Sequence, residues 1–333
     1  MKLRFVFLGI LFLANIALAA DLPKLIIYTT KSLHSSIRKS SHPFKKRFES
    51  ICNCEVEFVP VGGSNVMLSR LILEGKNSPA DLVIGLDNNL AEKARELDLF
   101  APHNVRFDHL NLPITWSDPY FLPYDYGYIS FIYNSKKLKN PPASFKDLLD
   151  NPSIRIIIQD PRASTVGLGL VSWIRLIYGD KAKEVWKKLK RNIVTVTKSY
   201  SNSYNLFYRG EADMLLSYST SPAYNMIAED NYDIKAAKFK EGHYLQLELI
   251  AMPRTAKNPK LAQEFLKFVL TEDFQHSVPI GNFMYPVIDI GNDLPKEYSQ
   301  IFTPDHVLIV TPEQVKKYRN LWIQEWLQAY SEK

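Results

Sequence analysis

Apolar runs of strand length alternate with helical patterns along the first part of the chain. Residues 24–30 (KLIIYTT) and 80–89 (ADLVIGLDNN) contain continuous apolar runs, and residues 55–61 (EVEFVPV) alternate between apolar and polar side chains. Residues 44–50 and 62–75, which lie between these runs, have helical patterns. This strand–helix–strand–helix–strand order predicts a parallel sheet with right-handed crossovers.

A second α/β unit follows a long aromatic strand. Residues 122–138 (LPYDYGYISFIYNSKKL) predict this strand, which is the candidate crossing between two lobes. Strands and helices then alternate again between residues 154 and 220, and residues 244–253 (YLQLELIAMP) predict a returning strand. Residues 258–271 and 311–332 predict helices near the end of the chain.

The length of 333 residues is enough for two lobes rather than one compact core. We therefore expect a two-lobed α/β fold. Residues 21–120 would form the first part of lobe 1 and residues 121–250 lobe 2. Residues 251–333 would return to lobe 1 and end in a C-terminal helix.

Ligands of open α/β sheets bind beyond the carboxyl ends of the strands. The candidate site therefore consists of the loops that follow the predicted strands, at residues 29–30, 62–64, 87–88, 163–165, 198–200 and 218–221. These loops are selected by their position after the strands, and not by residue type alone.

Residues 159–170 (QDPRASTVGLGL) place two hydroxyl side chains between a predicted strand and a predicted helix. Ser164 and Thr165 would lie beside helix N–H groups that have no intrahelical partner, at the positive end of the helix dipole. This arrangement suits an anion such as phosphate. The alternative is that Ser164 or Thr165 only caps the helix.

Four aromatic side chains in polar loops are candidates for flat walls of a binding site. They are Tyr200, Tyr218, Tyr224 and Phe283. Aromatic faces hold heteroaromatic rings and attract cations by about 0.5–2 kcal/mol each. The alternative for each is core packing.

The N-terminus has the pattern of a secretory signal peptide, residues 1–20. A short basic segment (MKLR) precedes an apolar run that ends in small residues around Ala17 and Ala19. The alternative is an uncleaved membrane anchor, but the run is short for a membrane-spanning helix. We therefore expect a mature periplasmic chain that begins at Ala20 or Asp21.

Charge and cysteine content bear on three further possibilities, namely nucleic-acid binding, a disulfide and a metal site. The net charge of +6 is spread along the chain, without the basic stripe and interleaved aromatics of a nucleic-acid-binding protein. Cys52 and Cys54 are the only two cysteines. Export to an oxidising compartment favours a disulfide between them. Half of a metal site is the alternative, but no further ligands follow at the usual spacings.

Several motifs resemble the periplasmic thiamine-binding proteins of thiamine ABC transporters. In chain order they are CNCEVEFV, LEGKNSPADLVIGLDNNL, PYDYGYISFIYNSKKLKNPP, QDPRASTVGLGL, LSYSTSPAY, EGHYLQLE and GNFMYPV. The resemblance implies a type II periplasmic binding protein fold, related to ferric- and spermidine-binding receptors, with the ligand in the interlobe cleft. It also implies a receptor without catalytic residues, cofactor or metal. Its ligand would be thiamine, thiamine monophosphate or thiamine pyrophosphate, and its partner an inner-membrane ABC permease with its ATPase.

The resemblance also assigns ligand contacts. The phosphate or hydroxyethyl end would contact Ser164, Thr165 and Tyr218. The rings would contact Tyr200, Tyr224 and Phe283, with Asn282 beside them.

The chain departs from the family pattern at several of these positions. Thr30 stands where an aromatic residue is expected, and Gly63 and Ser64 stand where an acid–glycine pair is expected. Tyr200 and Phe283 replace tryptophans. The missing acid matters because an aminopyrimidine and a thiazolium both favour a carboxylate, for which Asp87 and Asp125 are candidate replacements.

Two other classes of protein are the alternatives. A ferric-binding receptor shares the expected fold, but it requires clustered tyrosinates with a histidine. The 18 tyrosines include no Tyr-Tyr pair, and the histidines are scattered. A hydrolase requires a nucleophile, a base and an orienting acid, and no G-x-S-x-G motif occurs. His243 is the only histidine near a predicted strand start, and we interpret it as a structural hydrogen-bonding group.

Overall fold

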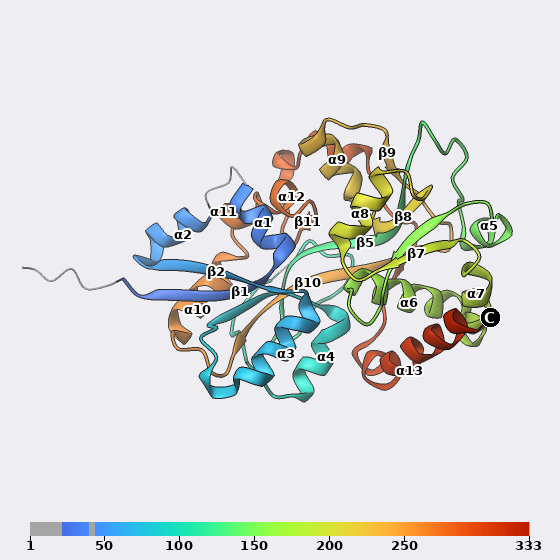
Figure 1. The fold of residues 1–333 in the computed structure, drawn as a ribbon. Coiled ribbons are helices and arrows are strands. Elements are labelled where there is room, and N and C mark those ends of the chain that lie inside the picture. The colour runs from blue at the N-terminus through green and yellow to red at the C-terminus, as the bar shows by residue number, and fades with distance from the viewer. Residues whose placement is uncertain (1–21, 40–43, 109, 333) are drawn as a thin grey trace, which may run out of the picture.

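The structure, a computed structural model, describes residues 22–39, 44–108 and 110–332. The predicted signal peptide and its cleavage site lie outside the described residues. Figure 1 shows two lobes arranged along a mixed sheet with helices on both faces. Within the described ranges, no helix is long and apolar enough to span a membrane.

Lobe 1 contains the first three strands, which are parallel as the sequence predicts. β1 (Lys24–Thr30) lies between β2 (Glu55–Gly62) and β3 (Leu82–Asp87) and pairs in parallel with both. The remaining elements of this segment are α1 (Lys31–Lys39), α2 (Phe44–Cys52), α3 (Ser64–Glu74), the 3₁₀ helix η1 (Gly75–Asn77), α4 (Asn88–Glu96) and β4 (Phe100–Ala101).

Lobe 2 repeats this arrangement. β6 (Ile156–Gln159) lies between β7 (Ile193–Thr197) and β8 (Met214–Tyr218) and pairs in parallel with both. The other elements are α5 (Phe145–Asp150), α6 (Thr165–Tyr178), η2 (Gly179–Lys181), α7 (Ala182–Leu189), α8 (Tyr200–Tyr208), α9 (Ser221–Glu229) and β9 (Ile234–Ala236).

Two long strands join the lobes. β5 (Leu122–Asn134) pairs antiparallel with β10 (His243–Pro253) through its first half and with β8 through its second half. β10 also pairs antiparallel with β3. The order of the main strands is β2-β1-β3-β10-β5-β8-β6-β7. The predicted crossing strand and returning strand are therefore confirmed.

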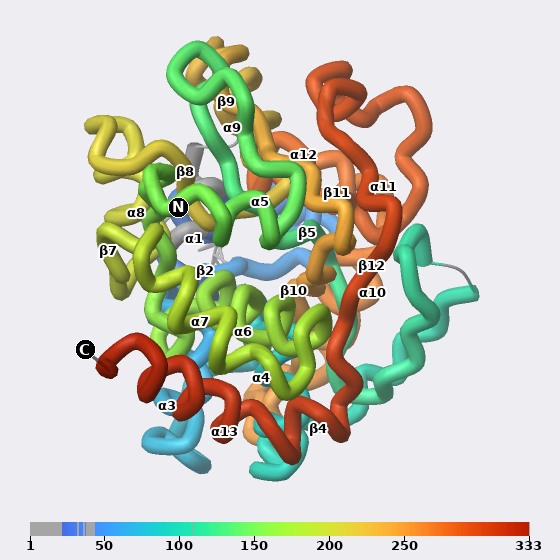
Figure 2. Tube along the Cα trace, turned by 90° about the vertical axis from the view of Figure 1, so that its right-hand side faces the viewer, coloured from blue at the N-terminus to red at the C-terminus, as the bar shows by residue number. Residues whose placement is uncertain are grey.

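The chain after β10 first covers lobe 1 and then reaches lobe 2. Its elements are α10 (Pro259–Phe268), α11 (Glu272–Gln275), α12 (Val278–Gly281), β11 (Tyr285–Pro286), η3 (Gly291–Asp293), η4 (Lys296–Gln300), β12 (Val307–Leu308) and α13 (Pro312–Ser331). α10 packs against α2 and β10, and α12 packs against α1. α13, seen along the lower edge of Figure 2, packs against α4 of lobe 1 and against α6 and α7 of lobe 2.

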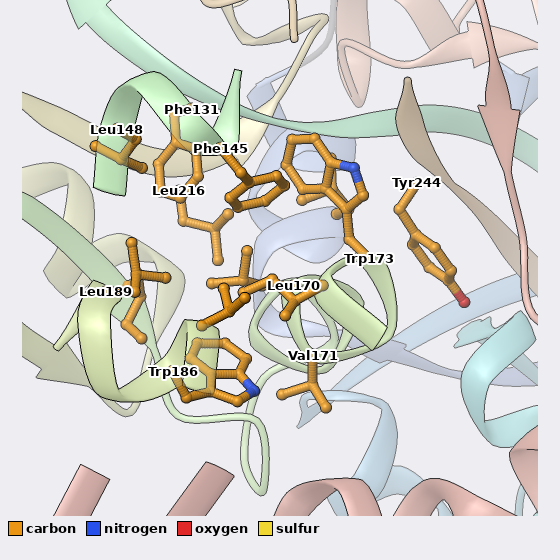
Figure 3. Packing of buried hydrophobic residues seen from close by; sticks show 14 of the residues in the cluster. Phe131, Phe145, Leu148, Leu170, Val171, Trp173, Trp186, Leu189, Leu216 and Tyr244 are labelled. Carbon is orange, nitrogen blue, oxygen red and sulfur yellow. The ribbon is translucent and has the colours of Figure 1, made fainter. Parts of the chain in front are cut away.

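A buried aromatic cluster fixes α6 in lobe 2 (Figure 3). The centroids of the Trp173 and Phe145 rings are 4.7 Å apart, and the Trp173 indole N–H donates to the carbonyl oxygen of Gly242 at 3.0 Å. Trp322 and Trp326 of α13 belong to the same core. This buried core therefore fixes the position of α6 and of its N-terminus.

Cys52 and Cys54 form a disulfide. The bond joins the end of α2 to the residue before β2. Cys54 is buried in the core of lobe 1. The disulfide therefore supports the packing of α2 and lies apart from the carboxyl ends of the strands.

Candidate functional site

The loops after β2 and β6 bring the two lobes into contact. Gly63 precedes α3, and Ala163 lies just before Ser164, the N-cap of α6. A Cβ atom added to Gly63 would lie 3.9 Å from the carbonyl oxygen of Ala163. The N-termini of α3 and α6, one from each lobe, therefore lie close together.

The glycine before Gly63 has a backbone role. Gly62 has φ of 148°, and a Cβ atom at this position would lie 3.0 Å from the side chain of Val66. Only glycine adopts this conformation without strain. Gly62 thus turns the chain from β2 into α3 and places Gly63 at the lobe boundary.

Thr30 and Ser64, two predicted ligand residues, both meet Gly85 of β3. The Ser64 hydroxyl donates to the Gly85 carbonyl oxygen at 2.6 Å. A Cβ atom on Gly85 would lie 2.7 Å from Cγ2 of Thr30, whose hydroxyl oxygen accepts the Leu33 N–H at 3.1 Å. Both hydroxyls therefore have local structural partners in lobe 1, and their contact with a ligand stays a prediction.

Ser164 caps α6, as the alternative to anion binding predicts. Its Oγ accepts the Gly167 N–H at 3.3 Å, which leaves the hydroxyl proton able to donate elsewhere. Thr165 is the first residue of the helix, and both side chains are partly exposed. A Cβ atom on Gly167 would lie 2.3 Å from the carbonyl oxygen of Gln159. Glycine at this position lets the N-terminus of α6 lie directly against the end of β6.

The predicted tyrosines of lobe 2 gather around a pair of serines. The Tyr200 hydroxyl lies 2.6 Å from Ser217 Oγ, which lies 2.7 Å from Ser221 Oγ. The centroids of the Tyr200 and Tyr218 rings are 6.1 Å apart. Tyr204, which the sequence interpretation missed, lies 5.1 Å from Tyr200 by ring centroids. Its spacing of four residues from Tyr200 on α8 was the available signal.

Tyr224 and Phe283 meet across the lobe boundary. Tyr224 lies on α9 of lobe 2, and Phe283 follows α12 of lobe 1. Their ring centroids are 5.1 Å apart in an edge-to-face arrangement. Phe283 has φ of 56°, which is rare for a bulky residue and indicates stored backbone strain. Such strain is concentrated at functional sites, where the surrounding structure maintains it.

Asn282 connects two acids of the central strands. Its Nδ2 donates to Oδ2 of Asp125 at 2.6 Å and to Oε2 of Glu248 at 3.0 Å. The Tyr124 hydroxyl donates to the same Glu248 oxygen at 2.5 Å. Sequence reasoning identified Asn282 and Asp125 but missed Glu248, because an acid within an apolar returning strand carries no motif.

Burial determines the protonation of the tyrosine cluster. Burial raises the pKa of Tyr200 and Tyr218 well above their usual value and raises that of Tyr204 as well. These hydroxyls are therefore protonated when no metal ion is bound, which disfavours the tyrosinates of a ferric site. In the part of the chain that the structure describes, no group of three His, Cys, Asp or Glu side chains is placed to hold a metal ion.

Known proteins resemble the chain over almost its whole length. The thiamine-binding periplasmic protein of Salmonella typhimurium is 46% identical over 310 residues, covering 93% of this chain and 94% of the relative. A solved periplasmic thiamin binding protein is 45% identical and has a TM-score of 0.87, covering 93% of this chain and 97% of its own. A ferric binding protein from Campylobacter jejuni, with 19% identity and a TM-score of 0.74, covers 92% of this chain and 99% of its own, and shares the fold alone.

The family comparison agrees with the architecture. The sequence profile described as bacterial extracellular solute-binding protein matches residues 35–276. The two lobes, the crossing strands and the strand-end loops have the arrangement of a type II periplasmic binding protein. The chain therefore belongs to the bacterial extracellular solute-binding protein family.

Proposed function

We propose that this chain is a periplasmic receptor that captures thiamine, thiamine monophosphate and thiamine pyrophosphate between its lobes. One observation carries the proposal: helix N-termini suited to an anion lie in the same interlobe region as an aromatic pair and buried acids. The identity to thiamine-binding periplasmic proteins supports this ligand.

The anion end of the ligand would lie against the starts of α3 and α6. Helix N-termini present N–H groups and a positive partial charge, and phosphates bind at such ends. The hydroxyl protons of Ser164 and Thr165 add two possible donors. Because α3 and α6 come from different lobes, an anion held between them would also stabilise the contact between the lobes.

The ring end would lie against the aromatic pair of Tyr224 and Phe283. Aromatic faces hold flat rings by contact and attract a cation. Tyr224 belongs to lobe 2 and Phe283 to lobe 1, so the ring would contact both lobes. Ligand binding and lobe closure would therefore be linked.

The receptor would deliver its ligand to an inner-membrane ABC permease with an associated ATPase. We assign it no catalytic step, because the family and the relatives that the chain resembles are binding proteins. His243, the histidine nearest the central strands, is fixed between the Phe239 N–H and the Ile129 carbonyl. Burial lowers its pKa to about 4, as expected of a structural histidine.

Removal of both hydroxyls at the start of α6 tests the anion end. The Ser164→Ala/Thr165→Ala variant loses up to two hydrogen bonds to a charged group, each worth about 1.5–3 kcal/mol. Calorimetry should therefore show about a 10- to 100-fold weaker affinity for thiamine monophosphate and pyrophosphate, and little change for thiamine.

A remote helix cap provides the matched control. Ser144 caps α5, accepting the Asp147 N–H at 2.9 Å. Ser144→Ala should cost about 1 kcal/mol of unfolding free energy without affecting any of the three affinities. Equal losses for thiamine and its phosphates in the Ser164→Ala/Thr165→Ala variant would show that these hydroxyls do not bind the phosphate.

A further inference from the structure

Three acids lie side by side across the central strands. Glu248 of β10 is paired in register with Asp87 of β3 on one side and with Asp125 of β5 on the other. We call these three residues the acid row. Like charges directly opposite on neighbouring strands destabilise a sheet, so this arrangement is unfavourable for folding alone.

Two buried oxygens of the acid row accept no hydrogen bond from the described residues. Asp125 has no exposed surface, and its Oδ1 accepts no hydrogen bond from the described residues. Asp87 is 1% exposed, and its Oδ2 likewise accepts no hydrogen bond from the described residues. The other oxygen of Asp87 caps α4 by accepting the Asn89 N–H at 2.9 Å. A buried carboxyl oxygen without a donor is costly, so these atoms indicate a missing positive or N–H-bearing group.

The surroundings of the acid row contain little compensating charge. The Tyr124 hydroxyl and the Asn282 amide donate to it. The nearby hydroxyls of Tyr218 and Tyr298 are neutral and are engaged elsewhere, with the Gln246 amide and with backbone carbonyls. Arg319 of α13 is the cation that acts on Asp87, and burial lowers the pKa of that arginine. Asp125 and Asn282 line a pocket whose other walls are mostly apolar, including Ile84 and Phe274. These walls keep the local dielectric low and strengthen any charge interaction.

Burial of the acid row favours the protonated forms of these acids when no cation is present. Burial, followed by the charge of Glu248, raises the pKa of Asp125 well above its usual value. Burial also raises the pKa of Glu248 and raises that of Asp87 to about 7. A cation entering the row would favour the ionised acids and displace a proton to the solvent.

We propose that Asp125 and Glu248, with Asp87 beside them, form the subsite that recognises the positively charged ring of the ligand, and that the ring displaces a proton from one of these acids. The inference rests on the proposed function. The loop after β2 has Gly63 and Ser64 where an acid–glycine pair was expected. The acid row would supply the carboxylate from the central strands. The O–H bond of one acid breaks, its proton passes to the buffer, and the carboxylate keeps the electron pair beside the cation.

Two ligands distinguish the effect of the ring's charge on affinity from the effect of its shape. Thiamine carries a thiazolium cation, and 3-deazathiamine has a neutral ring of the same outline. Wild-type protein should bind thiamine at least about 10-fold more tightly than the neutral compound. Asp125→Asn and Glu248→Gln should remove most of this preference by weakening thiamine alone.

Proton release gives a second readout. Titration of wild-type protein with thiamine near pH 6.5, in buffers of different ionisation enthalpy, should show release of up to about one proton. Both variants should release less. Asp180→Asn, which removes a fully exposed acid on lobe 2, is the matched control and should behave as wild type.

The fold of the variants can be checked without ligand. A raised folded-state pKa makes wild-type protein lose stability as the pH rises through the window between the unfolded and folded pKa values. Asp125→Asn should therefore gain stability relative to wild type as the pH rises above the usual range of a carboxyl pKa.

Each outcome decides the inference. Loss of the thiamine preference together with loss of proton release supports it. If the variants weaken thiamine and 3-deazathiamine equally, or if thiamine binds without proton release, the inference fails and the proposed function stands. If wild-type protein binds no thiamine, both fail.

Discussion

Replacement of Gly167 with alanine should disrupt the anion end of the site. The new Cβ would lie 2.3 Å from the Gln159 carbonyl oxygen and 3.1 Å from the carbonyl carbon of Asp160, both backbone atoms. The N-terminus of α6 must therefore move away from β6. Overpacking of this kind typically costs about 1–3 kcal/mol of unfolding free energy. We also expect at least about a 10-fold weaker affinity for thiamine phosphates, because the helix end no longer meets the anion.

Gly169 is the matched comparison two residues along the same helix. A Cβ atom there would lie 3.0 and 3.2 Å from side-chain atoms of Ile129, which can shift. Gly169→Ala should therefore lower stability less and leave the preference for phosphates intact. Denaturant unfolding and calorimetry of both variants check this expectation. If Gly167→Ala behaves like Gly169→Ala in both measurements, the close packing of α6 on β6 does not position the anion site.

Loss of either ring at the lobe boundary should weaken all three ligands alike. Tyr224 and Phe283 contribute aromatic faces from opposite lobes, and each contact with a cationic ring is worth about 0.5–2 kcal/mol in addition to the apolar area covered. Tyr224→Ala and Phe283→Ala should each reduce the affinity for thiamine and its phosphates by about 10- to 100-fold. Calorimetry with the three ligands measures the losses.

The backbone strain at Phe283 permits a sharper control. Phe283→Gly also removes the ring, but glycine tolerates φ of 56°. It should therefore be about 0.5–1 kcal/mol more stable than Phe283→Ala and should lose the same affinity. Tyr232→Ala, which removes an exposed tyrosine of lobe 2, should bind as wild type. Affinity that returns in Phe283→Gly would mean that backbone geometry, and not the ring, governs binding.

Much of the fold could be predicted because its signals are local. The parallel strands of both lobes come from apolar runs separated by amphipathic helices, and the aromatic run at residues 122–138 indicates the crossing strand β5. Two features had weaker signals. α4 begins directly after β3 at Asn88, where the polar residues read as a strand end. The contact of α13 with both lobes depends on tertiary packing that no periodicity describes.

The positions of the candidate site residues in the fold were predictable where strand ends define them. Ser164, Tyr200 and Tyr218 follow strands, and the structure places all three at the carboxyl ends of β6, β7 and β8. The acid row was not predictable, because it depends on register. Asp87, Asp125 and Glu248 are far apart in sequence, and only the pairing of β3, β10 and β5 aligns them.

Direct titration of the ligand-free protein with thiamine is the most direct test of the receptor function. The protein should be unfolded and refolded first, so that any ligand retained during purification is removed. We predict one site per chain with a dissociation constant below about 1 μM, which corresponds to about −8 kcal/mol. A folded protein that takes up neither thiamine nor its phosphates at about 50 μM would contradict the proposed ligand.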